Sequence, residues 1–162
     1  MERIWAPWRM EYILDKKPDG CIFCLPNETE GDRDRLVLSR TPLSIIMLNR
    51  YPYTNGHLMA APRRHTADLG SLTDDEMLDL IKTVSLCRTI LQKEASPQGF
   101  NIGLNVGRAA GAGVEDHLHF HIVPRWNGDT NFMTVIADVR VVPEGLRATY
   151  DMLFPHFTGQ PT

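Results

Sequence analysis

Histidine alternates with apolar residues in the run H-L-H-F-H-I at residues 117–122. Successive side chains of an extended strand point to opposite faces, so the three imidazoles share one face and the apolar three share the other. One buried imidazole is readily satisfied by a hydrogen bond, but three on one face are hard to explain by packing. Histidine suits nucleophilic attack, proton transfer and metal binding near neutral pH. The run therefore predicts a half-buried strand with one functional face.

The chain is expected to form a single domain over residues 1–162, with an N-terminal arm at 1–20 and a C-terminal tail from about 139 to 162. A net charge of −3 disfavours a nucleic-acid polymer as partner, since phosphate neutralisation needs a basic face. No apolar run approaches the roughly 20 residues that span a bilayer, and three cysteines do not suggest a disulfide scaffold. We expect no membrane partner and a cytoplasmic location.

Five segments have the composition and alternation of strands. A long helix is expected between the third and fourth, opened by Thr73 with Glu76 in a capping box. Short connections favour an α+β fold with an antiparallel five-stranded meander and the helix on one sheet face. The expected strands are 36–38, 43–48, 57–61, 100–106 and the histidine strand, which ends near 124–126; the helical stripe expected to be core is Met77, Leu80, Ile81, Val84, Cys87 and Leu91.

A glycine-rich loop at 107–113 directly precedes the histidines. Backbone amides in such a loop can hold an anion, and histidines that emerge just after it would face that anion. The chemistry implied is attack on phosphorus, with His119 as nucleophile and His121 holding a phosphate oxygen or protonating the leaving group. A site with all three histidines on one metal ion is the alternative, but the strand spreads their rings over roughly 13 Å.

Residues 111–126, G-A-G-V-E-D-H-L-H-F-H-I-V-P-R-W, resemble the signature of the histidine triad superfamily of nucleotide hydrolases and transferases. N-R-Y-P-Y-T-N-G-H at 49–57 resembles the nucleotide-binding loop of that family, and the likeness runs from Trp5 to about Phe132. It implies that His119 is the nucleophile and that His121 and His57 assist at the phosphate. It also implies nucleotide contacts at Asn49 and Asn105. The remaining residues expected to bind the nucleotide are Gly111, Ala112 and Gly113 of the glycine-rich loop, His121 and Trp126.

Several of these residues also have simpler interpretations. Asn49 and Asn105 suit turn or loop chemistry, and His57 could be a hydrogen-bonded histidine at a strand start. Trp126 could stack on an adenine or pack at a strand end.

One position departs from the family pattern. Many members carry Gln four residues before the first histidine of the triad, followed by Ser or Thr, where this chain has Gly113 and Val114. The contact that Gln makes near the bridging phosphate is therefore missing, which could open space for inorganic phosphate as acceptor. W-A-P-W-R at 5–9 and W-N-G-D-T-N-F-M at 126–133 resemble a bacterial branch similar to diadenosine tetraphosphate phosphorylases.

Cys21 and Cys24 form a C-x-x-C pair, which by itself fits zinc, redox chemistry or chance. Family members with this start hold zinc with two histidines, which correspond here to His65 and His117. The resemblance thus implies a structural Cys2His2 zinc site that orients the histidine strand. A metal-free thiol pair beside a hydrogen-bonded His65 is the alternative.

The leading hypothesis is phosphorolysis of diadenosine tetraphosphate to ATP and ADP through a nucleotidyl-histidine. The alternatives are hydrolysis of dinucleoside polyphosphates or adenosine phosphoramidates, and a non-catalytic nucleotide-binding protein. The expected partners are adenine dinucleoside polyphosphates, AMP, ATP and phosphate. Mg²⁺ can accompany the substrate, although no carboxylate cage for it is visible. The resemblance also implies a homodimer formed through the long helix and a sheet edge.

Overall fold

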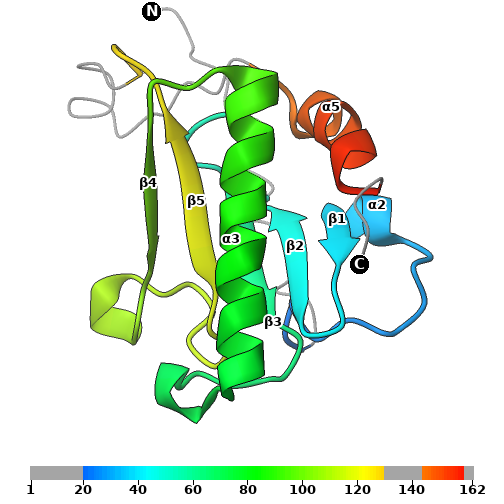
Figure 1. The fold of residues 1–162 in the computed structure, drawn as a ribbon, viewed down its shortest axis with the longest axis vertical. Coiled ribbons are helices and arrows are strands. Elements are labelled where there is room, and N and C mark those ends of the chain that lie inside the picture. The colour runs from blue at the N-terminus through cyan, green and yellow to red at the C-terminus, as the bar shows by residue number, and fades with distance from the viewer. Residues whose placement is uncertain (1–19, 130–143, 159–162) are drawn as a thin grey trace, which may run out of the picture.

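A computed structural model describes residues 20–129 and 144–158. Five antiparallel strands form one sheet in the order β1-β2-β3-β5-β4, and helix α3 lies across one of its faces (Figure 1). No helix in these two ranges is both long and apolar enough to cross a membrane. The elements are α2 Asp32–Arg35, β1 Val37–Arg40, β2 Ser44–Leu48, β3 Leu58–Pro62, η1 Leu69–Ser71, α3 Asp74–Ala95, β4 Gly99–Leu104, η2 Arg108–Ala110, β5 Phe120–Arg125 and α5 Leu146–Thr158.

Helix α3 begins where its sequence predicts. The Thr73 hydroxyl accepts from the backbone N–H of Glu76, and the Glu76 carboxylate accepts from the N–H of Thr73, which completes the capping box. Arg64 adds two hydrogen bonds of 2.7 and 2.8 Å to the same carboxylate. The start of α3 is thereby joined to the turn that follows β3.

The two faces of the sheet have different contents. Alternate residues of the strands pack under α3 in the main core, where Cys87 is fully buried, as expected of a small hydrophobe. The other face carries a smaller apolar cluster and, in register with Met59, the side chain of His121. That second cluster, called the histidine-face cluster below, consists of Phe23, Val37, Ile45, Met47, Met59 and Ala61.

The α+β class, the five antiparallel strands and the long helix are confirmed, and three details differ from expectation. Strand β5 lies between β3 and β4, so the strand order departs from a simple meander. Strand β5 begins at Phe120, so the first two histidines of the triad precede it in irregular backbone. Met77 and Ile81 are 39% and 50% exposed, because α3 turns that side away from the sheet.

Helix α5 lies within the expected C-terminal tail and packs beside β1 and α3 (Figure 1). The hydroxyl of Tyr150 donates to the carbonyl of Val37 at 2.9 Å, and both residues are buried. The expected arm at 1–20 lies almost wholly outside the described residues, as do 139–143 and 159–162 of the expected tail and residues 130–133 of the bacterial motif.

We predict that Glu76→Gln changes the pH dependence of stability. Hydrogen bonds from Arg64 and the Thr73 N–H lower the pKa of Glu76 from 4.5 to about 2. The folded chain therefore binds the proton less readily than the unfolded chain, so this contribution is present above pH 4.5 and is lost as the pH falls toward 2. In denaturant titrations, wild type should be the more stable above pH 4.5, and the difference should shrink toward pH 2.

The matched control is Asp75→Asn, an exposed carboxylate in the same helical turn. Its difference from wild type should vary less with pH. A Glu76→Gln difference that stays constant from pH 6 to pH 2 would contradict the role given to the ion pair.

Candidate active site and metal cluster

Two histidines from neighbouring strands meet on the face of the sheet opposite α3. His57 precedes β3 and His121 lies in β5, and the antiparallel pairing of these strands brings Nε2 of His57 to 2.9 Å from Nδ1 of His121. His57 is completely buried. The Tyr53 ring lies against both imidazoles, at 4.6 and 5.8 Å between ring centroids.

The hydrogen bonds around this pair determine where its protons lie. The backbone N–H of Tyr53 donates to Nδ1 of His57 at 3.1 Å, so a neutral His57 carries its proton on Nε2. That N–H then donates to Nδ1 of His121, which places the His121 proton on its own Nε2. Burial, with a smaller contribution from His119, lowers the pKa of His121 to about 4, so His121 is neutral at pH 7.

His119 has the opposite tautomer. Its Nδ1 donates to the carbonyl of His117 at 2.8 Å, so its Nε2 carries the lone pair. The side chain is 4% exposed, and burial lowers its pKa below the usual value, which keeps the imidazole neutral. The His119 and His121 rings meet edge to face with centroids 4.8 Å apart. A nitrogen lone pair and an N–H donor therefore belong to adjacent rings.

His117 faces a separate cluster. Its Nδ1 lies 3.2 Å from Sγ of Cys21, 3.6 Å from Sγ of Cys24 and 3.2 Å from Nδ1 of His65. Sγ of Cys24 lies 3.1 Å from Nδ1 of His65. The four ligand atoms all lie within 4.8 Å of one another, so the sequence-predicted set is brought together.

The geometry of this cluster fits one small tetrahedral ion. With bonds of ~2.1 Å to nitrogen and ~2.3 Å to sulfur, the ligand atoms around zinc lie about 3.3–3.8 Å apart. Nε2 of His117 donates to the carbonyl of Pro62 at 2.8 Å, which leaves the Nδ1 lone pair facing the cluster. Such a donation from the second ring nitrogen is usual for histidine bound to metal. The cluster could hold a metal ion.

Phe23 was not singled out by the sequence analysis, although it lies between the two cysteines. Its ring centroid is 5.1 Å from that of His117 and 5.0 Å from that of His119. It is 2% exposed and belongs to the histidine-face cluster. Its position between the two cysteines could have drawn attention to Phe23 in the sequence, but its contacts with His117 and His119 are known only from the fold.

The glycine-rich loop closes partly on itself. The N–H groups of Ala110 and Ala112 donate to the carbonyl of Gly107, and that of Gly111 donates to Arg108. Those three amides are thus engaged within the loop and do not face an anion site. Gly107 and Gly111 have φ of 79° and 86°, which favours glycine at both.

The remaining predicted nucleotide contacts lie at different distances from the histidines. Asn49 has its Nδ2 3.3 Å from Nδ1 of His57, while its Oδ1 accepts from the N–H of Tyr51. Asn105 directs its Nδ2 to the carbonyl of Gly111 at 3.5 Å. Trp126 directly follows the last residue of β5, about 16 Å along the strand from His121 at the usual rise per residue.

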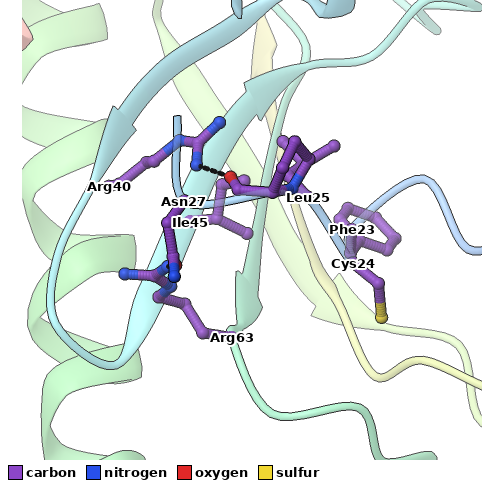
Figure 2. A pocket seen from close by; sticks show the side chains of 8 residues that line it. Phe23, Cys24, Leu25, Asn27, Arg40, Ile45 and Arg63 are labelled. Carbon is purple, nitrogen blue, oxygen red and sulfur yellow. Dashed lines mark hydrogen bonds between the residues drawn. The ribbon is translucent and has the colours of Figure 1, made fainter. Parts of the chain in front are cut away.

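The loop that carries Cys21 and Cys24, residues 21–27 (the cysteine loop), borders a pocket of about 450 Å³ (Figure 2). Its polar wall is already paired: the Arg40 guanidinium bonds to Asp32 and to the Pro26 carbonyl, and Arg63 donates to Oδ1 of Asn27 at 2.7 Å. These bonds hold the segment after Cys24 against the sheet. No histidine lines this pocket.

Comparisons with known proteins agree with this arrangement. The family model for the HIT domain matches residues 30–128. The AP-4-A phosphorylase of Mycobacterium tuberculosis is 37% identical over 169 residues, covering 99% of this chain and 87% of that protein. The adenosine 5'-monophosphoramidase of Schizosaccharomyces pombe is 31% identical over 129 residues, covering 80% and 92%.

A solved structure of a zinc-bound histidine triad family protein from Mycobacterium smegmatis is also similar. It is 25% identical, covers 76% of this chain and 84% of its own, and has a TM-score of 0.62. The sheet and helix described above are therefore those of a known fold.

Proposed function

The chain belongs to the HIT domain family of nucleotide-processing enzymes, and we propose that it cleaves dinucleoside polyphosphates by phosphorolysis. Its substrate in this proposal is diadenosine tetraphosphate, and the products with inorganic phosphate are ATP and ADP. The observation that carries the proposal is the pair of opposite tautomers on His119 and His121.

In the first step, the Nε2 lone pair of His119 attacks the α-phosphorus. A P–N bond forms, the bond from that phosphorus to the bridging oxygen breaks, and ATP leaves with the bond electrons. The Nε2–H of His121 donates a hydrogen bond to a phosphate oxygen as negative charge develops there. With a pKa of about 4 before substrate binds, His121 stabilises the charge as a neutral donor.

In the second step, a phosphate oxygen attacks the phosphorus of the nucleotidyl-histidine. The P–N bond breaks, His119 recovers its lone pair, and AMP joined to phosphate leaves as ADP. Space at Gly113 supports phosphate as acceptor, because a Cβ built there would meet no atom within 4 Å. The 37% identity to a protein named AP-4-A phosphorylase supports the same choice.

Hydrolysis through the same intermediate is the second candidate, favoured by the 31% identity to a phosphoramidase. It differs only in the acceptor, which is water, or in the leaving group, which is an amine. The residues that form the nucleotidyl-histidine are the same in both.

Incubation of diadenosine tetraphosphate with and without inorganic phosphate tests the proposal. ATP and ADP should form only with phosphate, whereas ATP and AMP formed without phosphate would reject phosphorolysis in favour of hydrolysis. His119→Ala should lower kcat by about 1,000-fold or more, because no other group supplies the nucleophile. The matched control is His156→Ala, which removes a histidine of α5 that pairs with Glu94 near the C-terminal end of α3 and should retain activity.

We also propose that the Cys21, Cys24, His65 and His117 cluster holds a structural zinc ion. Support comes from the ligand distances, the Pro62 carbonyl behind His117 and the zinc-bound relative. Zinc bound there would hold the cysteine loop against the segment that carries the histidines.

Protein purified without chelator should contain about one zinc per chain by elemental analysis. Cys24→Ala should lose most of the zinc and lower the melting temperature, because the remaining three ligands no longer close the site. Cys87→Ala removes a buried thiol outside the cluster and should retain the zinc. Wild-type protein without metal would reject the proposal.

We further propose that two copies associate through α3 and the edge strand β4. Three apolar residues of α3, Met77, Leu78 and Ile81, are 39–55% exposed. Ile102 in β4 and Val106 just after it are 44% and 62% exposed. These exposed apolar side chains lie on α3 and at the edge strand of the sheet, and their burial against a second copy of the chain would favour a dimer.

Sedimentation should give twice the mass of the chain. Ile81→Glu should shift the protein toward monomer, since it places a charge in the apolar contact, while Lys82→Glu on the neighbouring exposed position should not. A wild-type monomer at micromolar concentration would exclude this association.

A further inference from the structure

Three polar side chains join the start of α5 to the loop that leads into His57: Asn55 in the loop, Glu144 just before α5 and Thr149 in its first turn. Nδ2 of Asn55 donates to Oε2 of Glu144 at 3.0 Å, and the hydroxyl of Thr149 lies 2.8 Å from the same oxygen. The Thr149 hydroxyl is also 3.2 Å from Oδ1 of Asn55. Glu144 and Thr149 lie beyond residue 128, where the match to the HIT domain ends.

Thr149 is the buried member of this link, and Asn55 and Glu144 are half-buried. Thr149 is 1% exposed, so its hydroxyl depends on protein partners. A hydroxyl has one proton, and the Glu144 carboxylate is its strongest nearby acceptor. Asn55 and Thr149 therefore both donate to one carboxylate oxygen, which ties the loop to the first turn of α5.

The loop that Asn55 belongs to sets the orientation of His57. The N–H of His57 donates to the carbonyl of Thr54 at 3.3 Å, and the Thr54 hydroxyl donates to the carbonyl of Pro124 in β5 at 2.8 Å. The Tyr53 N–H donates to Nδ1 of His57 and places its proton on Nε2. A shift of Asn55 would move Thr54 and Tyr53 and weaken that donation.

We propose that Glu144 and Thr149 are positioning residues for His57, acting through Asn55. They hold residues 53–57 in the conformation that keeps the His57 proton on Nε2 and the His121 proton facing the phosphate. This role rests on the proposed nucleotidyl transfer for its effect on rate, but the tautomer it predicts can be measured without substrate.

Thr149→Val tests the link, because it removes the hydroxyl and keeps the shape. We expect kcat for diadenosine tetraphosphate with phosphate to fall about tenfold, with KM changed less than twofold, since the histidines are misplaced but the nucleotide contacts remain. Thr149→Ser should restore kcat. Glu144→Gln keeps an acceptor oxygen and should be milder than Glu144→Ala.

Tyr150→Phe is the matched control. It removes a buried hydrogen bond between α5 and β1, to the carbonyl of Val37, and leaves the loop untouched. It should lower the melting temperature about as much as Thr149→Val, with kcat within twofold of wild type. If both variants lower kcat in proportion to their loss of stability, α5 has only a structural role and the proposal fails.

Long-range ¹H–¹⁵N NMR spectra of the imidazoles provide the second readout. In wild type and Tyr150→Phe, His57 should carry its proton on Nε2, and in Thr149→Val it should populate both tautomers. Unchanged tautomers and unchanged kcat in Thr149→Val would overturn the proposal. A wild type that turns over no dinucleotide would reject the proposed function alone, because the tautomers are measured on the free protein.

Discussion

The hydrogen bond from Nδ1 of His119 to the carbonyl of His117 joins the two halves of the site. His117 is held by the Pro62 carbonyl on one ring nitrogen and by the cysteine cluster on the other. Its backbone carbonyl then fixes both the orientation and the tautomer of His119. These two residues precede β5 and lie outside its strand pairing. Their segment is held by these side-chain contacts and by the backbone N–H of Leu118, which donates to the carbonyl of Thr66 at 2.7 Å.

Burial gives the site its chemical character. Removing imidazoles from water disfavours their charged forms, so neighbouring rings remain neutral and each must have a defined tautomer. Two sets of hydrogen bonds fix these tautomers. Donation from the Tyr53 N–H to His57, and from His57 to His121, fixes the tautomer of His121, and donation from His119 to the His117 carbonyl fixes that of His119. The result is a lone pair and a donor on adjacent rings, which is what attack on an anionic phosphorus centre needs.

The two faces of the sheet have different roles, one in the stability of the fold and one in the candidate site. One face packs against α3 in the main core, while the other carries the imidazoles and the histidine-face cluster, of which Phe23 is a member. Segments distant in sequence support the chemical face: the cysteine loop contacts His119 through Phe23, and α5 reaches the His57 loop through Asn55. Both supports come from outside the span matched to the HIT domain, which begins at residue 30 and ends at 128.

The local sequence alone determined the strands, the start of α3 at its capping box, the buried Cys87 and the alternation that sends imidazoles to one face, because these depend on period and on near neighbours. The likeness to the histidine triad family joined His65 and His117 to the C-x-x-C pair, because the complete set spans residues 21 to 117 and no local pattern links its members. Only the tertiary structure decided that β5 lies between β3 and β4 and that Met77 and Ile81 face outward. It also decided the tautomers, because a proton's position on an imidazole depends on which carbonyl or amide lies opposite each nitrogen, and residues distant in the chain supply several of those partners.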